Sequence, residues 1–144
     1  MSYRGPKAKL SRRLGIALAP KCEKFLATRP HPPGMHGKTR RPGKMSDYGR
    51  QLQEKQRLRF QYNISEKQMR NYYLSAAKQK GNTVVNLNQQ LESRLDVLVL
   101  RTGFARSIHM ARQLVVHGHI TIDGKKVDRP SYVIHPGQVI SVRE

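Results

Sequence analysis

Basic residues and prolines are concentrated in the first 50 residues of this chain, which limits where a hydrophobic core can form. The 144 residues include 28 Lys and Arg against 9 Asp and Glu, a net charge of +19. Residues 1–50 hold 13 of these basic residues, 2 acidic residues and six of the eight prolines, whereas residues 83–144 have a net charge of only +3. A hydrophobic fraction of 37% supports one modest core. We therefore expect the compact part of the chain in its second half.

The segment 1–45 is predicted to be an extended basic arm with little regular structure of its own. Its densest part, RPHPPGMHGKTRRPGK at 29–44, combines prolines that extend the backbone with basic residues suited to phosphate. A disordered tail is the alternative. The basic residues of this arm that are candidates for contact with phosphate are Arg4, Lys7, Arg12, Arg13, Arg40, Arg41 and Lys44.

The charge favours a polyanionic partner, either nucleic acid or an anionic membrane. No apolar run approaches the length of a bilayer-spanning helix, and the first residues lack the apolar segment of a signal peptide. We therefore expect a soluble intracellular protein with no membrane partner. The single cysteine, Cys22, cannot form an internal disulfide.

Two helices are predicted in a helical region at 46–85. Ser46 can cap the first, and Ser65 with Gln68 has the spacing of a capping box for the second. Gly81 is placed to end the second helix. The apolar residues expected on their inner sides are Leu52, Leu58, Tyr62, Met69, Tyr72, Tyr73 and Ala76.

Residues 86–144 have the pattern of a compact domain. LNQQLESRLDVLVLRTG predicts one helix with Leu91, Leu95, Leu98 and Val99 on one face. Arg94 and Arg101 lie seven residues apart on another face, where they are either RNA ligands or ordinary surface charges. After Gly103, a second helix is predicted to end at Gly118.

This second helix, within GFARSIHMARQLVVHGHI, carries an apolar face and a donor-rich face. Ile108, Ala111, Leu114 and Val115 are predicted to be core. The opposite face, the turn after the helix and the following lysines supply the candidate RNA-binding residues Arg106, His109, Arg112, Gln113, His117, Gly118, His119, Lys125 and Lys126.

The remaining residues predict a small antiparallel sheet. HITIDGKKV alternates apolar and polar residues around Asp123-Gly124, the dipeptide of two-residue hairpin turns. Further strands are expected at 131–134 and 138–142, separated by a turn at Pro136-Gly137. The sheet and the two helices should share one core.

The motifs that could indicate chemistry are weak. GKT at 37–39 has Pro32 where a phosphate-binding loop requires glycine, and the histidines lack the spacing of zinc ligands. RLD at 94–96 is similar to a catalytic motif of pseudouridine synthases, but Asp96 lies inside a predicted helix, where an ion pair or a helix-surface role is favoured. We expect neither an enzyme nor a metal or other cofactor.

Long strings in this sequence resemble the ribosomal protein S4 family in its bacterial and organellar form. They include YRGPKAKLSRRLG, RPHPPGMHG, LESRLDVLVLRTGFA and PSYVIHPGQVISVRE. The resemblance implies an α+β fold, in which an extended arm (1–45) and a helical region (46–85) precede an S4-type RNA-binding domain (86–144) of two helices on a small antiparallel sheet. It also implies a structural protein of the small ribosomal subunit, which binds the 5′ domain of small-subunit rRNA and nucleates assembly of the subunit body.

The same resemblance implies neighbouring ribosomal proteins and the mRNA entry path as further contacts. The chain departs from some relatives, because Cys22 alone cannot replace their zinc-binding cysteine cluster and Ile108 stands where many have arginine. Many members also continue with a further helical segment. The RRLG string resembles cyanobacterial and plastid members, so a ribosome in a bacterial cytoplasm or a plastid is expected. A free-standing RNA-binding factor or translational repressor with an S4 domain is the alternative.

Overall fold

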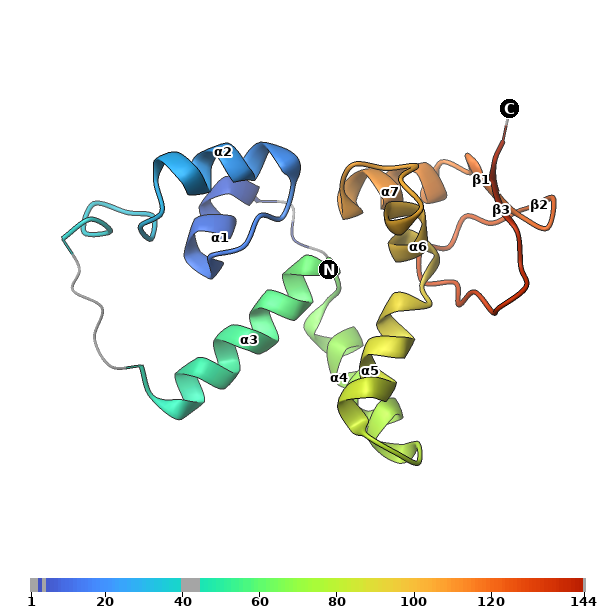
Figure 1. The fold of residues 1–144 in the computed structure, drawn as a ribbon, viewed down its shortest axis with the longest axis horizontal. Coiled ribbons are helices and arrows are strands. Elements are labelled where there is room, and N and C mark those ends of the chain that lie inside the picture. The colour runs from blue at the N-terminus through green and yellow to red at the C-terminus, as the bar shows by residue number, and fades with distance from the viewer. Residues whose placement is uncertain (1–2, 4, 40–44, 144) are drawn as a thin grey trace. The chain divides into compact units, whose positions relative to one another are not determined.

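The computed structural model describes residues 3, 5–39 and 45–143 and divides the chain into two compact units, Met1–Ser65 and Glu66–Glu144. Among the described residues, seven helices precede three short strands of one antiparallel sheet. The predicted α+β class is confirmed (Figure 1).

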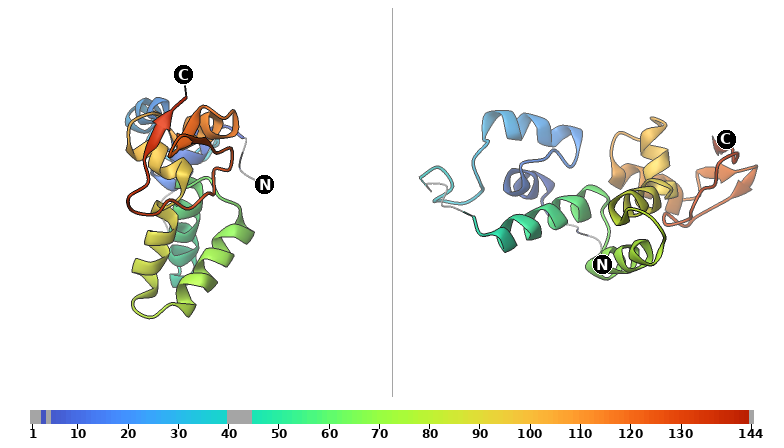
Figure 2. Two further views of the ribbon diagram at one scale, coloured as in Figure 1. Left: turned by 90° about the vertical axis from the view of Figure 1, so that its right-hand side faces the viewer. Right: turned by 60° about the horizontal axis from the view of Figure 1, so that its bottom comes forward.

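The first unit contains α1 (Lys7–Leu14), α2 (Pro20–Thr28) and α3 (Asp47–Gln61). Leu10, Leu14 and Leu18 form a small buried cluster, against which Phe60 of α3 packs. Figure 2 shows α1 between α2 and α3. The prediction of an arm with little regular structure is therefore wrong for residues 7–28. A few leucines at helical spacing build a local core that the overall composition concealed.

The predicted helix after Ser46 is confirmed as α3. The Ser46 hydroxyl accepts a hydrogen bond from the Gly49 amide at 3.1 Å, the capping interaction that the sequence indicated. No residue within α3 is fully buried, and Leu52 is 38% exposed. Tyr62, which follows the helix, is buried.

The second unit begins with two helices, α4 (Glu66–Lys78) and α5 (Thr83–Glu92), which lie side by side (Figures 1 and 2). Met69 and Ala76 of α4 are buried, as predicted, together with Leu87 and Leu91 of α5. Tyr73 is 54% exposed, so its predicted place on the apolar side is wrong.

The single helix predicted from residue 87 to 103 is wrong, because the chain breaks between α5 and α6 (Leu95–Arg101). Arg94 has an extended backbone with ψ 142°, and residues 93–96 pair with the segment 130–134. In this pairing the Ile134 amide donates to the Ser93 carbonyl at 2.8 Å, and the Leu95 amide donates to the Tyr132 carbonyl at 2.8 Å. Because the helix is interrupted here, backbone amides and carbonyls of the two segments form hydrogen bonds with each other.

The sheet follows α7 (Ile108–Val116) and has the strand order β2-β1-β3, with β1 at Ile120–Ile122, β2 at Lys125–Lys126 and β3 at Ile140–Val142. Ile122 pairs with Lys125, so the predicted two-residue turn at Asp123-Gly124 is confirmed. Both turn residues have positive φ, 50° and 78°, as a type I′ turn requires.

The strand predicted at 131–134 is wrong, since this segment makes only an isolated bridge between Val133 and Arg94. The predicted shared core is confirmed. Its buried residues come from α6, α7, the turn between them and β1: Leu95, Val99, Ala105, Ala111, Val115, Ile120 and Ile122.

Candidate RNA-binding surface

The surface predicted to bind RNA is organised by α7, whose apolar side lies in the core. Ser107 is the N-cap of this helix, and its hydroxyl accepts a hydrogen bond from the Met110 amide at 3.3 Å. Ile108, Ala111 and Val115 are buried, as the sequence pattern predicted. Burial of this side fixes which side of α7 faces solvent.

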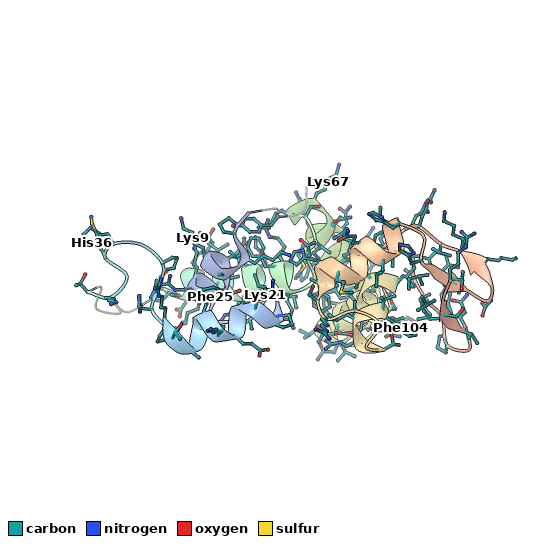
Figure 3. The ribbon with its side chains drawn as sticks, turned by 90° about the horizontal axis from the view of Figure 1, so that it is seen from above. Lys9, Lys21, Phe25, His36, Lys67 and Phe104 are labelled. Atoms are coloured by element: carbon teal, nitrogen blue, oxygen red, sulfur yellow. The ribbon has the colours of Figure 1, made fainter. Side chains whose placement is uncertain are left out.

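The outward side of α7 carries four of the predicted residues. Gln113 and His117 are exposed, whereas His109 and Arg112 are partly buried. Arg106 is exposed but lies before the N-cap, in a bend, so its predicted place in the helical row is wrong. The turn between α6 and α7 that holds it also exposes Phe104, which is 41% exposed (Figure 3).

The turn after α7 brings a lysine of the hairpin against the end of the helix. Gly118 has φ 75°, and a β-carbon there would collide with the end of the Lys126 side chain. The rings of His117 and His119 stack with their centroids 6.2 Å apart and an interplanar angle of 14°. Three nitrogen-bearing side chains therefore gather at this turn, which offers several hydrogen-bond donors and a positive charge.

The two adjacent lysines of β2 point to opposite faces of the sheet, because side chains alternate along a strand. Lys126 pairs with Thr121, whose hydroxyl hydrogen-bonds that of Ser141 at 2.7 Å. Lys125 pairs with the buried Ile122 and is itself exposed. Of the two lysines, only Lys126 lies against the histidine turn.

Arg94 is 0% exposed, so its interpretation as a helix-surface charge is wrong. Its guanidinium donates to both carboxylate oxygens of Asp96, at 3.0 and 2.7 Å, and to the Tyr72 hydroxyl at 2.7 Å. Burial alone would lower the pKa of Arg94, but the hydrogen bond and charge of Asp96 outweigh it and raise that pKa. The ion pair favoured for Asp96 is confirmed.

Arg101 and Arg112 both follow this buried pair in the sequence, and they differ in setting. Burial lowers the pKa of Arg112, the nearby Asp96 carboxylate opposes this shift, and the Arg94 charge adds to it. Arg112 thus lies near the buried pair and is only partly available at the surface. Arg101 is paired with Glu92, at 3.1 and 2.8 Å, in an exposed position.

The predicted residues of the first unit are distributed along α1. Arg13 is exposed and Lys7 partly buried. Arg12 donates to the carbonyls of Arg29 at 3.0 Å and His31 at 3.2 Å, so its guanidinium holds the chain that follows α2. The predicted residues Arg4, Arg40, Arg41 and Lys44 lie outside the described residues.

One basic residue beside the histidine turn was missed by the sequence reasoning. The Arg143 amide donates to the His119 carbonyl at 2.8 Å, and the Arg143 side chain is exposed. The pairing of Ile120 with Val142 sets this position. The position of Arg143 could have been predicted from the register between β1 and β3, but the sequence indicates the strands and not how they pair.

Within the described ranges, no three His, Cys, Asp or Glu side chains gather as metal ligands would. None of the helices described is long and apolar enough to span a bilayer.

Comparisons with known proteins agree on the class. A model of the S4 domain matches residues 93–140, and a model of the ribosomal protein S4/S9 N-terminal domain matches residues 2–92. The fold and these matches define a basic protein in which an S4 domain follows a helical N-terminal region.

Relatives extend the match over nearly the whole chain. Proteins called small ribosomal subunit protein uS4 from Pelodictyon phaeoclathratiforme and Chlorobaculum tepidum are 56% and 54% identical over 142 residues, which cover 99% of this chain and 70% of each relative. The protein of that name from Micrococcus luteus is 58% identical over 134 residues, 93% of this chain and 64% of the relative. The chain belongs to the ribosomal protein S4 family.

Proposed function

We propose that this chain is a structural component of the small ribosomal subunit, where it binds the 5′ domain of the small-subunit rRNA and nucleates assembly of the subunit body. The observation that carries the proposal is the match of residues 2–92 to the ribosomal protein S4/S9 N-terminal domain, directly before the match of residues 93–140 to the S4 domain. A free-standing S4-domain factor needs only the second part, so the first match favours the ribosomal role.

The RNA surface that we propose consists of the outward side of α7, the turn after it and Lys126. Gln113, His117 and His119 are exposed there, and Lys126 supplies a fixed positive charge. Structured RNA is recognised largely through phosphates, 2′-hydroxyls and shape, so a rigid surface with varied donors suits it. Arg106 and Arg143 extend this surface at its two ends. Arg112 is partly buried and contributes only its exposed part.

We carry Lys125 and Arg101 as secondary proposals. Lys125 faces away from the histidine turn, and Arg101 would have to leave its ion pair with Glu92 to bind phosphate. Arg94 is left out of the proposed surface, because it has no exposed surface with which to touch RNA. On the first unit, Lys7 and Arg13 are the α1 residues best placed for phosphate contact, together with the arm that follows α2.

Neighbouring small-subunit proteins are proposed as further partners, and contact with the mRNA entry path is a finer proposal that rests on the family resemblance. The same holds for the absence of enzymatic activity and for a bacterial or plastid compartment of the ribosome.

The direct test is the affinity of the full chain for a 5′-domain transcript and for a scrambled structured RNA across a salt series. We expect steep salt dependence for both RNAs and an advantage of the 5′ domain that persists at high salt. The His117→Ala/Lys126→Ala variant should lose most of that advantage, whereas Arg70→Ala, an exposed change on α4, should keep it. Equal affinity of the two RNAs at every salt concentration would contradict the proposal.

A second test separates the ribosomal role from that of a free factor. A structural component remains with small subunits through a high-salt wash in a sedimentation experiment, whereas a loosely bound factor is released. The tagged chain should therefore sediment with washed subunits.

A further inference from the structure

A groove of about 530 Å³ lies on the second unit, and none of its lining residues belongs to the proposed RNA surface. Its walls come from α4, from the end of α5 and from the segment that pairs with residues 93–96. This volume is within the range of about 300–1,000 Å³ that is usual for ligand sites. The lining residues are Gln68, Asn71, Tyr72, Ser75, Gln79, Gln90, Ser93, Ser131 and Val133.

The lining side chains are mostly amides and hydroxyls, and none of them carries a charge. The Gln90 amide donates a hydrogen bond to the Ser75 hydroxyl at 3.2 Å, which holds these two lining side chains in place. The Tyr72 hydroxyl accepts a hydrogen bond from the buried Arg94, which holds the Tyr72 ring in the wall of the groove. Groups that both donate and accept match ribose 2′-hydroxyls and base edges, whereas phosphates or metal ions call for charged ligands.

Two exposed lysines border the groove on the same side of α4. Lys67 and Lys78 are eleven residues apart, which is about three helical turns or roughly 16 Å along the axis. By helical spacing both lie next to Asn71, beyond the rim. Figure 3 shows Lys67 extending from the start of α4 into solvent. A neutral groove with lysines at its border is complementary to a nucleic-acid strand whose phosphates remain outside.

We propose that this α4–α5 groove is a second RNA contact, which takes ribose 2′-hydroxyls and base edges while Lys67 and Lys78 hold phosphates of the same strand. The inference rests on the proposed function and adds a site to it. An extended peptide also presents donors and acceptors, but the lysine border favours the polyanion. A peptide occupant is therefore left as an outcome of the test.

The experiment compares three variants of the full chain on the 5′-domain transcript. Asn71→Ala/Gln79→Ala removes two exposed amides of the lining. We expect about tenfold weaker binding from two lost hydrogen bonds, with an unchanged salt slope. Lys67→Ala/Lys78→Ala should weaken binding and reduce the slope of log affinity against log salt by about 1.5. The control is Arg70→Ala, since Arg70 lies two residues before Tyr72 and so on the side of α4 turned away from the groove lining, although it follows Lys67 by three residues. This variant should stay within about twofold of wild type.

A second measurement identifies the ligand group. The transcript is made with 2′-fluoro pyrimidines, which keep the phosphates but lose hydroxyl donors. Wild-type protein should bind it more weakly than the natural RNA, and Asn71→Ala/Gln79→Ala should reduce that difference. Circular dichroism before each titration confirms that the variants are folded.

The outcomes for this groove and for the proposed function are separate. If wild-type protein prefers the 5′ domain but both groove variants bind like wild type, the groove does not contact RNA, and a protein segment becomes the better occupant. If wild-type protein shows no preference at all, the proposed function fails first. If Arg70→Ala reduces the salt slope per charge removed as much as Lys67→Ala/Lys78→Ala does, the inference is also overturned, because the lysines then act only through net charge.

Discussion

Replacing Asp96 by Asn should destabilise the second unit more than any surface substitution. The change keeps the shape of the side chain but removes the carboxylate that accepts two hydrogen bonds from Arg94, whose exposure is 0%. Removing one partner of a buried ion pair costs about 3–5 kcal/mol, because the remaining charge is left without compensation. Proteins typically have a free energy of unfolding of about 5–15 kcal/mol, so this cost is a large fraction of the total stability.

The assay is urea unfolding, with amide hydrogen exchange at the buried Val99 as a probe that reports on this unit alone. The internal control is Glu92→Gln, which breaks the exposed pair with Arg101 and should cost less than about 1 kcal/mol. The double variant Arg94→Met/Asp96→Leu removes both charges and should recover most of the loss. A loss below about 1 kcal/mol for Asp96→Asn, or a double variant no more stable than the single one, would refute the reasoning.

Three further changes test local features of the two units. Gly124→Ala places a β-carbon at φ 78° and should lower the free energy of unfolding by about 1–2 kcal/mol in a thermal denaturation experiment. Ser11→Ala leaves the buried Leu18 amide without its acceptor, 3.2 Å away, and should cost about 1–3 kcal/mol in the same assay. NMR titration should give His31 a pKa below its ordinary value of 6.5, because partial burial and then the Arg12 charge disfavour protonation. The contribution of His31 to stability is therefore lost as the pH falls below 6.5. Arg12→Ala should raise the pKa of His31.

The helices and the hairpin could be predicted because their signals are local. The cap at Ser46, the apolar spacing of Ala111 and Val115 and the Asp123-Gly124 turn all lie within a few residues of the structure they specify. The predicted domain boundaries 1–45, 46–85 and 86–144 stay predictions. The structure divides the chain into two compact units after Ser65.

The errors came from partners that are distant in sequence. Arg94 fits a helical pattern from 87 to 103, and only its pairing with Val133 and its contact with Tyr72 reveal the break. In the first unit, Phe60 likewise packs against the leucine cluster from a distant point in the sequence. At the proposed RNA surface, the sequence indicated the donors of α7 but could not separate Lys126 from Lys125, because the face of each depends on register.

The strand order β2-β1-β3 has a consequence for the sequence of events in folding. The hairpin between β1 and β2 closes over two residues, whereas the hydroxyl contact between Thr121 and Ser141 joins positions twenty residues apart. Because longer loops cost more entropy to close, the hairpin can form early, and β3 joins it late. Arg143 and the backbone bond that ties it to His119 therefore complete the histidine turn last. During synthesis, this turn reaches its final form only after almost the entire chain described here has been made.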